Sequence, residues 1–142
     1  MAAFLLDTNV VSELIRPVPE ERVVRWIAER PATSLHLSAV TLAELVRGVR
    51  RLASGRRRTV LERWIAVDLT EKFGERILAF DREAAVIWGE LMGDADRRGQ
   101  PRGAADAQIA AIALRHGLTV TTRNEADFDG LRVRTLNPWN GS

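Results

Sequence analysis

Short apolar runs alternate with longer stretches of helical character along this 142-residue chain, and that alternation limits the folds open to it. The expected strands are residues 3–6, 34–37, 77–80, 118–121 and 131–133. Strands separated by helices are typical of a parallel sheet covered on both faces. We therefore predict a single domain over residues 1–142, of the α/β class, with a central parallel sheet of four to five strands between two helical layers.

Capping and turn residues place the expected helices. The first helix should start with Thr8 or Asn9 as its cap and end before Pro17, and Ser38 can cap a helix that runs to about Leu52. The other expected helices are residues 19–30, a long one after a basic turn at 54–58, one after Asp81 that ends before a polar loop at 94–102, and residues 103–116 closed by Gly117.

Composition excludes several kinds of chemistry. The chain has no cysteine, so disulfides, thiolate metal sites and cysteine nucleophiles are absent. No apolar run approaches the ~18 residues of a membrane span, and we expect a cytoplasmic protein that does not enter a membrane. The net charge is +2, and Lys72 is the only lysine. The excess of arginine suits phosphate binding, and a compositional bias of the source genome explains it equally well.

Four acidic residues lie in unusually apolar surroundings. Asp7 ends the first expected strand, and Asp127 follows the strand that ends near Thr121, so both should lie at the carboxyl edge of the sheet. Glu44 and Asp106 lie on expected helices with apolar neighbours, and we expect part of each acidic face to point inward.

Electrostatics indicates what such a cluster would hold. Two carboxylates ~4 Å apart repel by ~4 kcal/mol at an effective dielectric constant near 20. Four converging acids would therefore take up protons or bind a divalent cation. Oxygen ligands select a hard ion, Mg²⁺ or Mn²⁺, and such a site leaves positions for water and a substrate phosphate. This arrangement can catalyse phosphodiester hydrolysis.

Four short motifs also occur in an order that resembles a known family. They are Leu-Asp-Thr-Asn at residues 6–9, Ala-Glu-Leu-Val-Arg-Gly at 43–48, Asp-Ala-Gln-Ile-Ala-Ala at 106–111 and Thr-Thr-Arg-Asn-Glu-Ala-Asp-Phe at 121–128. Each motif alone is weak, but their order and spacing resemble PIN-domain ribonucleases of the VapC/FitB type. These are the toxins of type II toxin–antitoxin pairs, with a three-layer α/β/α fold.

The resemblance implies roles for individual residues. Asp7, Glu44 and Asp106 match the three acids that the family uses to hold Mg²⁺, and Asp127 matches a more variable fourth acid. Glu125 and Asp129 are alternatives for this fourth acid. Asp127 is favoured over both because Phe128 is its neighbour. The polar residues that match the family's supporting positions are Asn9, Thr122 and Asn124. The implied reaction is attack of water on an RNA phosphodiester, with Mn²⁺ as a substitute metal.

Partners are implied in the same way. The resemblance implies an RNA substrate, a homodimer and a cognate antitoxin that covers the acidic pocket. Arg47 and Arg57 belong to an arginine-rich stretch that could follow an RNA backbone, form a solvated turn or contact the antitoxin. Arg123 lies closer to the expected site and is a third candidate for RNA contact.

Other classes of protein also have an aspartate at the end of their first strand. A haloacid-dehalogenase-type phosphatase needs a second aspartate at position 9, which is Asn9, and a receiver domain needs a lysine after its last strand, where none occurs. Two alternatives within the fold stay open. One is a non-catalytic module that binds RNA or a protein partner, and the other is a PIN nuclease of housekeeping RNA processing.

Overall fold

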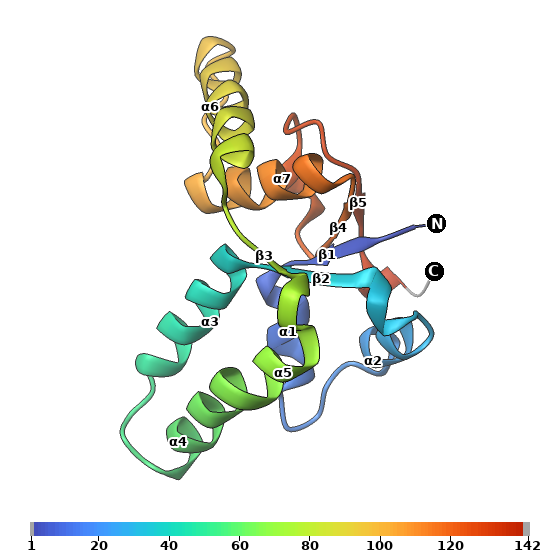
Figure 1. Cartoon of the computed structure of the whole chain (residues 1–142), viewed down its shortest axis with the longest axis vertical. Coiled ribbons are helices and arrows are strands. Elements are labelled where there is room, and N and C mark those ends of the chain that lie inside the picture. Colours follow the sequence, from blue (N-terminus) through green and yellow to red (C-terminus); the bar gives the residue numbers. More distant parts are fainter. Residues whose placement is uncertain (1, 141–142) are drawn as a thin grey trace.

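Five parallel strands form the centre of the molecule, in a computed structural model that describes residues 2–140 (Figure 1). The strand order is β3–β2–β1–β4–β5. The strands are β1 (Phe4–Leu6), β2 (Leu35–Ser38), β3 (Ile77–Leu78), β4 (Thr119–Thr121) and β5 (Thr135–Leu136). In the register of the central strands, Leu5 of β1 lies between His36 of β2 and Val120 of β4. The predicted parallel sheet is confirmed.

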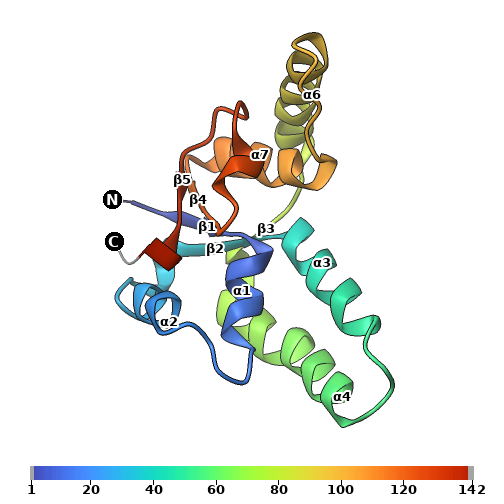
Figure 2. The same ribbon diagram turned by 180° about the vertical axis from the view of Figure 1, so that it is seen from behind.

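Helices cover both faces of this sheet. The helices on one face are α1 (Thr8–Leu14), α2 (Glu21–Ala28), α3 (Ala39–Arg50), α4 (Arg56–Arg63) and α5 (Thr70–Phe73), and those on the other are α6 (Arg82–Arg97) and α7 (Ala104–His116) (Figures 1 and 2). Alternation along β1 explains the two layers, because successive strand residues point to opposite faces. Phe4 and Leu6 join the core with α1, α2 and α3, whereas Leu5 packs against α7. The predicted three-layer α/β/α architecture is confirmed.

Two of the expected helix ends are confirmed and one is wrong. The Ser38 hydroxyl accepts the Thr41 N–H at 2.9 Å and caps α3 as predicted. Gly117 ends α7 in the left-handed conformation, with φ of 67°. The cap of α1 is Asp7, not Thr8 or Asn9, because Asp7 still has extended backbone while its carboxylate accepts the Thr8 N–H.

The basic turn expected at 54–58 and the loop expected at 94–102 are both too long. Helix α4 already begins at Arg56, and it continues through a π-helical segment, η2 (Trp64–Leu69), into α5. Helix α6 extends to Arg97. Arginine favours helix, and local charge gave no signal to start or stop it. No helix within residues 2–140 combines the length and apolar character needed to cross a membrane.

The prediction of a last strand at residues 131–133 is wrong, and β3 is shorter than the expected 77–80. Leu131 is buried, which resembles a strand pattern, but Arg132 has a left-handed φ of 63° that interrupts extended backbone. The strand forms at Thr135–Leu136 instead, beside β4. Strand β3 stops at Leu78, so Phe80 lies outside it.

Two glycines give a matched test of backbone conformation. Gly117→Ala places a Cβ at a left-handed residue and should lower the free energy of unfolding by about 1 kcal/mol. Gly48→Ala lies within α3, where an added Cβ meets no atom within 4 Å, and should raise it by about 0.5–1 kcal/mol. Urea unfolding of both variants measures the two shifts, and shifts of equal sign would contradict this assignment of helix end and helix interior.

Candidate active site at the carboxyl edge of the sheet

Asp7 is held where β1 ends, beside the end of β4. Its backbone N–H donates to the Thr121 carbonyl at 2.9 Å, which continues the pairing of the two strands by one residue. The side chain is buried, and each carboxylate oxygen has a donor. The Thr8 N–H donates to Oδ1 at 2.8 Å, and the Thr122 hydroxyl donates to Oδ2 at 2.8 Å. The Asn9 amide also donates to Oδ2, at 3.4 Å. All three partners are neutral, so Asp7 keeps its full negative charge when ionised.

The three supporting polar residues lie beside Asp7, but they act differently. The Asn9 amide donates to the Thr122 hydroxyl at 3.2 Å, and its carbonyl oxygen accepts the Arg123 N–H at 3.2 Å. The Asn124 backbone N–H donates to the Thr122 hydroxyl at 3.0 Å. The Asn124 side chain is exposed and makes no hydrogen bond to an acid within residues 2–140. Asn124 therefore supports the site through its backbone.

Glu44 reaches the site from α3, although the expectation that it points inward is wrong. Leu45 faces the core, and Glu44 is exposed on the adjacent side of the helix. Apolar sequence neighbours failed as a guide because Ala43 and Val46 are exposed as well. The Thr8 hydroxyl donates to Glu44 Oε1 at 2.6 Å, within the range of a charge-assisted hydrogen bond.

Thr8 is a site residue that the sequence did not indicate. Its hydroxyl also lies 3.3 Å from that of Thr41, which is fully buried and lies 3.2 Å from the Ser38 hydroxyl. These hydroxyls connect the Ser38 cap of α3 to Glu44, which lies six residues further along the same helix. The only available signal was a hydroxyl residue directly after the strand-end acid.

Asp106 approaches from the first turn of α7 and is half-buried. A Cβ at Gly103 would lie 3.1 Å from Asp106 Oδ2, so Gly103 leaves room for this carboxylate. The sequence analysis did not single out Gly103.

Of Glu125, Asp127 and Asp129, Asp127 is the acid whose charge reaches Asp7 and Asp106. It lies exposed in a short 3-10 helix, η4 (Glu125–Phe128), which the buried Phe128 anchors. Glu125 instead accepts a hydrogen bond from the Thr135 hydroxyl at 2.7 Å. The charge of Asp127 acts on both Asp7 and Asp106, whereas Asp129 has no such effect among the causes that shift their pKa values.

Burial and mutual repulsion perturb the acids. Burial is the largest cause that raises the pKa of the Asp106 carboxyl, to about 6. The charges of Asp7, Asp127 and Glu44 raise it further. Burial also raises the pKa of Asp7, and the hydrogen bonds from Thr122 and Thr8 oppose that rise in part. The charges of Glu44 and Asp127 therefore reach both Asp7 and Asp106.

No cation within the described chain balances this charge. The ion pairs found within residues 2–140 leave all four acids unpaired. All-oxygen donors and unbalanced charge fit a hard divalent cation. The side chains do not form a complete ligand set, however, because no three acidic or histidine side chains within residues 2–140 converge closely enough to hold a metal ion. The donor chemistry therefore fits, while a preformed ligand cage is lacking.

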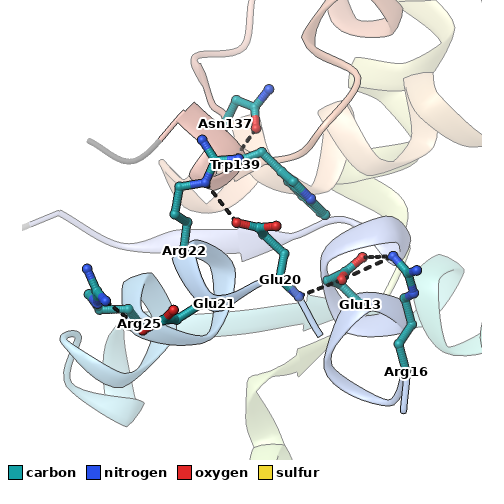
Figure 3. A network of polar contacts seen from close by, with 8 residues as sticks. All are labelled: Glu13, Arg16, Glu20, Glu21, Arg22, Arg25, Asn137 and Trp139. Carbon is teal, nitrogen blue, oxygen red and sulfur yellow. Dashed lines mark hydrogen bonds and ion pairs between the residues drawn. The ribbon is translucent and has the colours of Figure 1, made fainter. Parts of the chain in front are cut away.

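A second buried carboxylate shows the contrasting case (Figure 3). Glu13 is 4% exposed, accepts the Glu20 N–H at 2.8 Å and pairs with Arg16 at 3.1 Å. The Glu20 hydrogen bond is the largest cause that lowers the pKa of Glu13. Glu13 therefore ties the end of α1 to the start of α2. The sequence analysis did not single it out, and its apolar neighbours Val10 and Val11 were the available signal.

The candidate RNA-binding arginines occupy different places. Arg47 is exposed on α3, one turn after Glu44, and Arg57 is exposed in the first turn of α4. Arg123 is exposed beside Asn9, and its guanidinium lies 5.1 Å from the centre of the Trp139 ring. Only Arg123 shares hydrogen bonds with the residues around Asp7.

The structure is an α/β/α domain with four acids at the carboxyl edge of its sheet. Comparisons with known proteins identify the family to which such a domain belongs. The family model for the PIN domain matches residues 4–132. The chain belongs to the PIN-domain family, as the motifs predicted. Toxin FitB of Neisseria gonorrhoeae is 42% identical over 135 residues, which cover 95% of this chain and 97% of FitB. VapC ribonuclease Y4jK of Sinorhizobium fredii is 37% identical over 95% of this chain and 96% of its own length.

Solved structures agree with the sequence relatives. The crystal structure of FitAcB from Neisseria gonorrhoeae contains a chain with a TM-score of 0.90 and 42% identity, over 96% of this chain and 98% of that chain. DNA-bound VapBC from Salmonella typhimurium gives a TM-score of 0.75 at 26% identity, over 97% of this chain and 99% of that chain. The match extends over nearly the whole domain.

The raised pKa of Asp106 predicts a pH-dependent effect on stability in EDTA. A folded-state pKa near 6, above the ordinary 3.8, gives stability that is present at low pH and lost as the pH rises through 6. Asp106→Asn removes this loss. The free energy of unfolding of the variant relative to the parent should therefore rise by about 1 kcal/mol from acid to neutral pH, a value reduced for solvent screening. Urea unfolding across this range measures the difference, and a difference independent of pH would contradict the prediction.

Proposed function

We propose that this chain is the toxin of a type II toxin–antitoxin pair and acts as a divalent-metal-dependent endoribonuclease that hydrolyses RNA. The observation that carries the proposal is the set of carboxylates at the carboxyl edge that no cation balances within residues 2–140, where burial and then mutual repulsion raise the pKa of Asp106. The names of the relatives support it, since they include toxin FitB, VapC ribonuclease and tRNA(fMet)-specific endonuclease VapC. The proposal includes a cytoplasmic location and a single domain over residues 1–142.

Mg²⁺, or Mn²⁺ in its place, would be held by carboxylate oxygens. The proposed ligands are Asp7, Glu44, Asp106 and Asp127. When bound, the cation supplies charge neutralisation for the phosphate and favours the ionisation of water. Its charge would also remove the repulsion that raises the pKa of Asp7 and Asp106.

The protein's own residues prepare the site. Thr122 and the Thr8 N–H fix the two Asp7 oxygens, and the Thr8 hydroxyl holds Glu44 Oε1. Without a cation, the Asp106 carboxyl holds a proton up to about pH 6. Asn9 links this group to the segment that carries Arg123, which is exposed and can reach a phosphate or base at the edge of the site. Arg47 and Arg57 stay candidates for weaker contacts further along α3 and α4.

The partner is proposed on the names of solved complexes. Structures of FitAB and VapBC contain chains that match this one over at least 96% of its length. We propose a cognate antitoxin that covers the acidic pocket, and a homodimer of this chain. A protein segment that covers this pocket would face four carboxylates that no cation balances within residues 2–140.

Asp7→Asn tests the nuclease directly. The substitution keeps the side-chain volume and one oxygen acceptor but removes the charge of the most buried of the four proposed ligands. Cleavage of single-stranded or transfer RNA with Mg²⁺ or Mn²⁺ should therefore fall to the background of the assay. EDTA should have the same effect on the unsubstituted protein. Asp68→Asn, on the exposed side of η2, is the matched control and should cut as the parent does.

Two outcomes would contradict the proposal. Full activity in Asp7→Asn would remove this residue from the reaction. Failure of the folded, antitoxin-free parent to cut RNA with either metal would favour a PIN module that only binds RNA or protein.

Thr8→Val tests whether the Thr8 hydroxyl positions Glu44. Loss of the 2.6 Å hydrogen bond should lower kcat/KM for RNA cleavage about tenfold, the usual effect of losing a residue that orients a metal ligand. A higher Mg²⁺ requirement should accompany it. Thr59→Val is the control, because the Thr59 hydroxyl bonds only to the Gly55 carbonyl within α4. Equal kinetics and equal Mg²⁺ dependence in both variants would rule out the positioning role.

A further inference from the structure

A group of arginines lies where the end of α6 meets the loop that follows η4. This arginine rim comprises Arg97, Arg98, Arg102 and Arg132. Three of its members line a depression of about 400 Å³ together with Asp94. The arginines named above as candidates for RNA contact, Arg47, Arg57 and Arg123, lie elsewhere, on α3, on α4 and after β4.

The loop that faces α6 is shaped around these guanidinium groups. Gly130 and Arg132 both have left-handed φ angles, of 78° and 63°. Arg98 Nη2 donates to the Gly130 carbonyl at 3.4 Å. A Cβ at Gly130 would lie 3.3 Å from Arg98 Nη2 and 4.0 Å from Arg102 Nη2, so two guanidinium groups converge on this glycine.

The rim carries more positive charge than the protein balances. Asp94 is the one acid that lines the depression, and it pairs with Arg132 at 3.0 Å. Within residues 2–140, no ion pair engages Arg97, Arg98 or Arg102. The Nε of Arg102 is buried and has no hydrogen-bond partner in the described chain. These are donors that an anion could satisfy.

The rim is connected at both ends to the acidic site. Arg102 precedes Gly103, against which the Asp106 carboxylate lies, and Gly130 follows Asp127 by three residues. No arginine is among the groups that shift the pKa of Asp106. The guanidinium charges are therefore close to the site along the chain but are not used to neutralise its acids.

We infer that the arginine rim binds backbone phosphates of the RNA strand whose scissile phosphate lies at the four acids. This inference rests on the proposed function and deepens it, because it assigns the strand a path from the acidic site towards the end of α6. That end of the molecule lies opposite α4 (Figure 1), where the arginine-rich stretch had been the candidate. RNA is favoured over an acidic protein segment because the rim adjoins the proposed cleavage site at both of its ends.

The test measures RNA binding separately from cleavage. The parent carries Asp7→Asn and is kept in EDTA, and the probe is a short fluorescein-labelled oligouridylate followed by anisotropy over a series of KCl concentrations. Adding Arg97→Gln and Arg102→Gln should weaken binding about tenfold at low salt. The slope of log K against log salt should fall by about 1.4, at about 0.7 for each lost phosphate contact on a single strand.

A matched control removes equal charge elsewhere. Arg22→Gln with Arg25→Gln changes two exposed arginines on α2, on the other face of the sheet, and should leave affinity and slope nearly unchanged. Circular dichroism confirms the fold of each protein, and Arg97→Gln with Arg98→Gln replaces the first pair if Arg102→Gln does not fold.

Three results decide the inference. Equal losses in the rim and control variants, or no loss in either, would overturn it. Unchanged oligouridylate binding with reduced binding of a polyglutamate peptide would overturn it in favour of an acidic protein partner. The unsubstituted protein, which keeps Asp7, is assayed for cleavage in parallel. If it cuts no RNA but the rim variants alone lose RNA binding, the arginine rim is supported and only the nuclease proposal is rejected.

Discussion

Burial of an acid beside other acids at the carboxyl edge of the sheet is the constraint to which the rest of the site responds. Asp7 is 6% exposed, and burial is the largest cause that raises its pKa, to which the charges of Glu44 and Asp127 add. A folded protein tolerates this arrangement because each Asp7 oxygen has a hydrogen-bond donor.

The kind of donor separates this site from an ordinary buried acid. Thr8, Thr122 and the backbone supply neutral hydrogen bonds, which orient a carboxylate without cancelling its charge. Glu13 is equally buried, but its pKa falls because the Glu20 N–H donates to it and, to a lesser extent, because Arg16 pairs with it. One chain thus contains two buried carboxylates with opposite pKa shifts. Glu13, which has a cationic partner, joins two helices, whereas Asp7 forms no ion pair within residues 2–140.

Sequence reasoning reached most of the elements, because they depend on local patterns, and the same patterns singled out the four acids that are proposed as the site. Apolar runs located β1, β2 and β4, and the Ser38 and Gly117 signals located the ends of α3 and α7. It failed where long-range contacts decide the structure. Leu131 is buried by the tertiary fold in a loop, not in a strand, and this could not be separated from a strand pattern. The exposure of Glu44 depends on which side of α3 faces the core, and its bond to Thr8 spans 36 residues of sequence.

The topology explains why the acids meet where they do. From β1 the chain adds β2 and then β3 on one side, and it later adds β4 and β5 on the other side of β1. The reversal lies between β1 and β4, at the position where open α/β sheets form a crevice outside their carboxyl ends. Asp7 ends β1 at this reversal, and Thr122 follows β4 directly across from it. Glu44 approaches this edge from α3, Asp106 from the first turn of α7 and Asp127 from η4. The acids are thus far apart in the sequence, and their charges reach one another because the strand order places Asp7 at the reversal and the neighbouring helices carry the other three towards it.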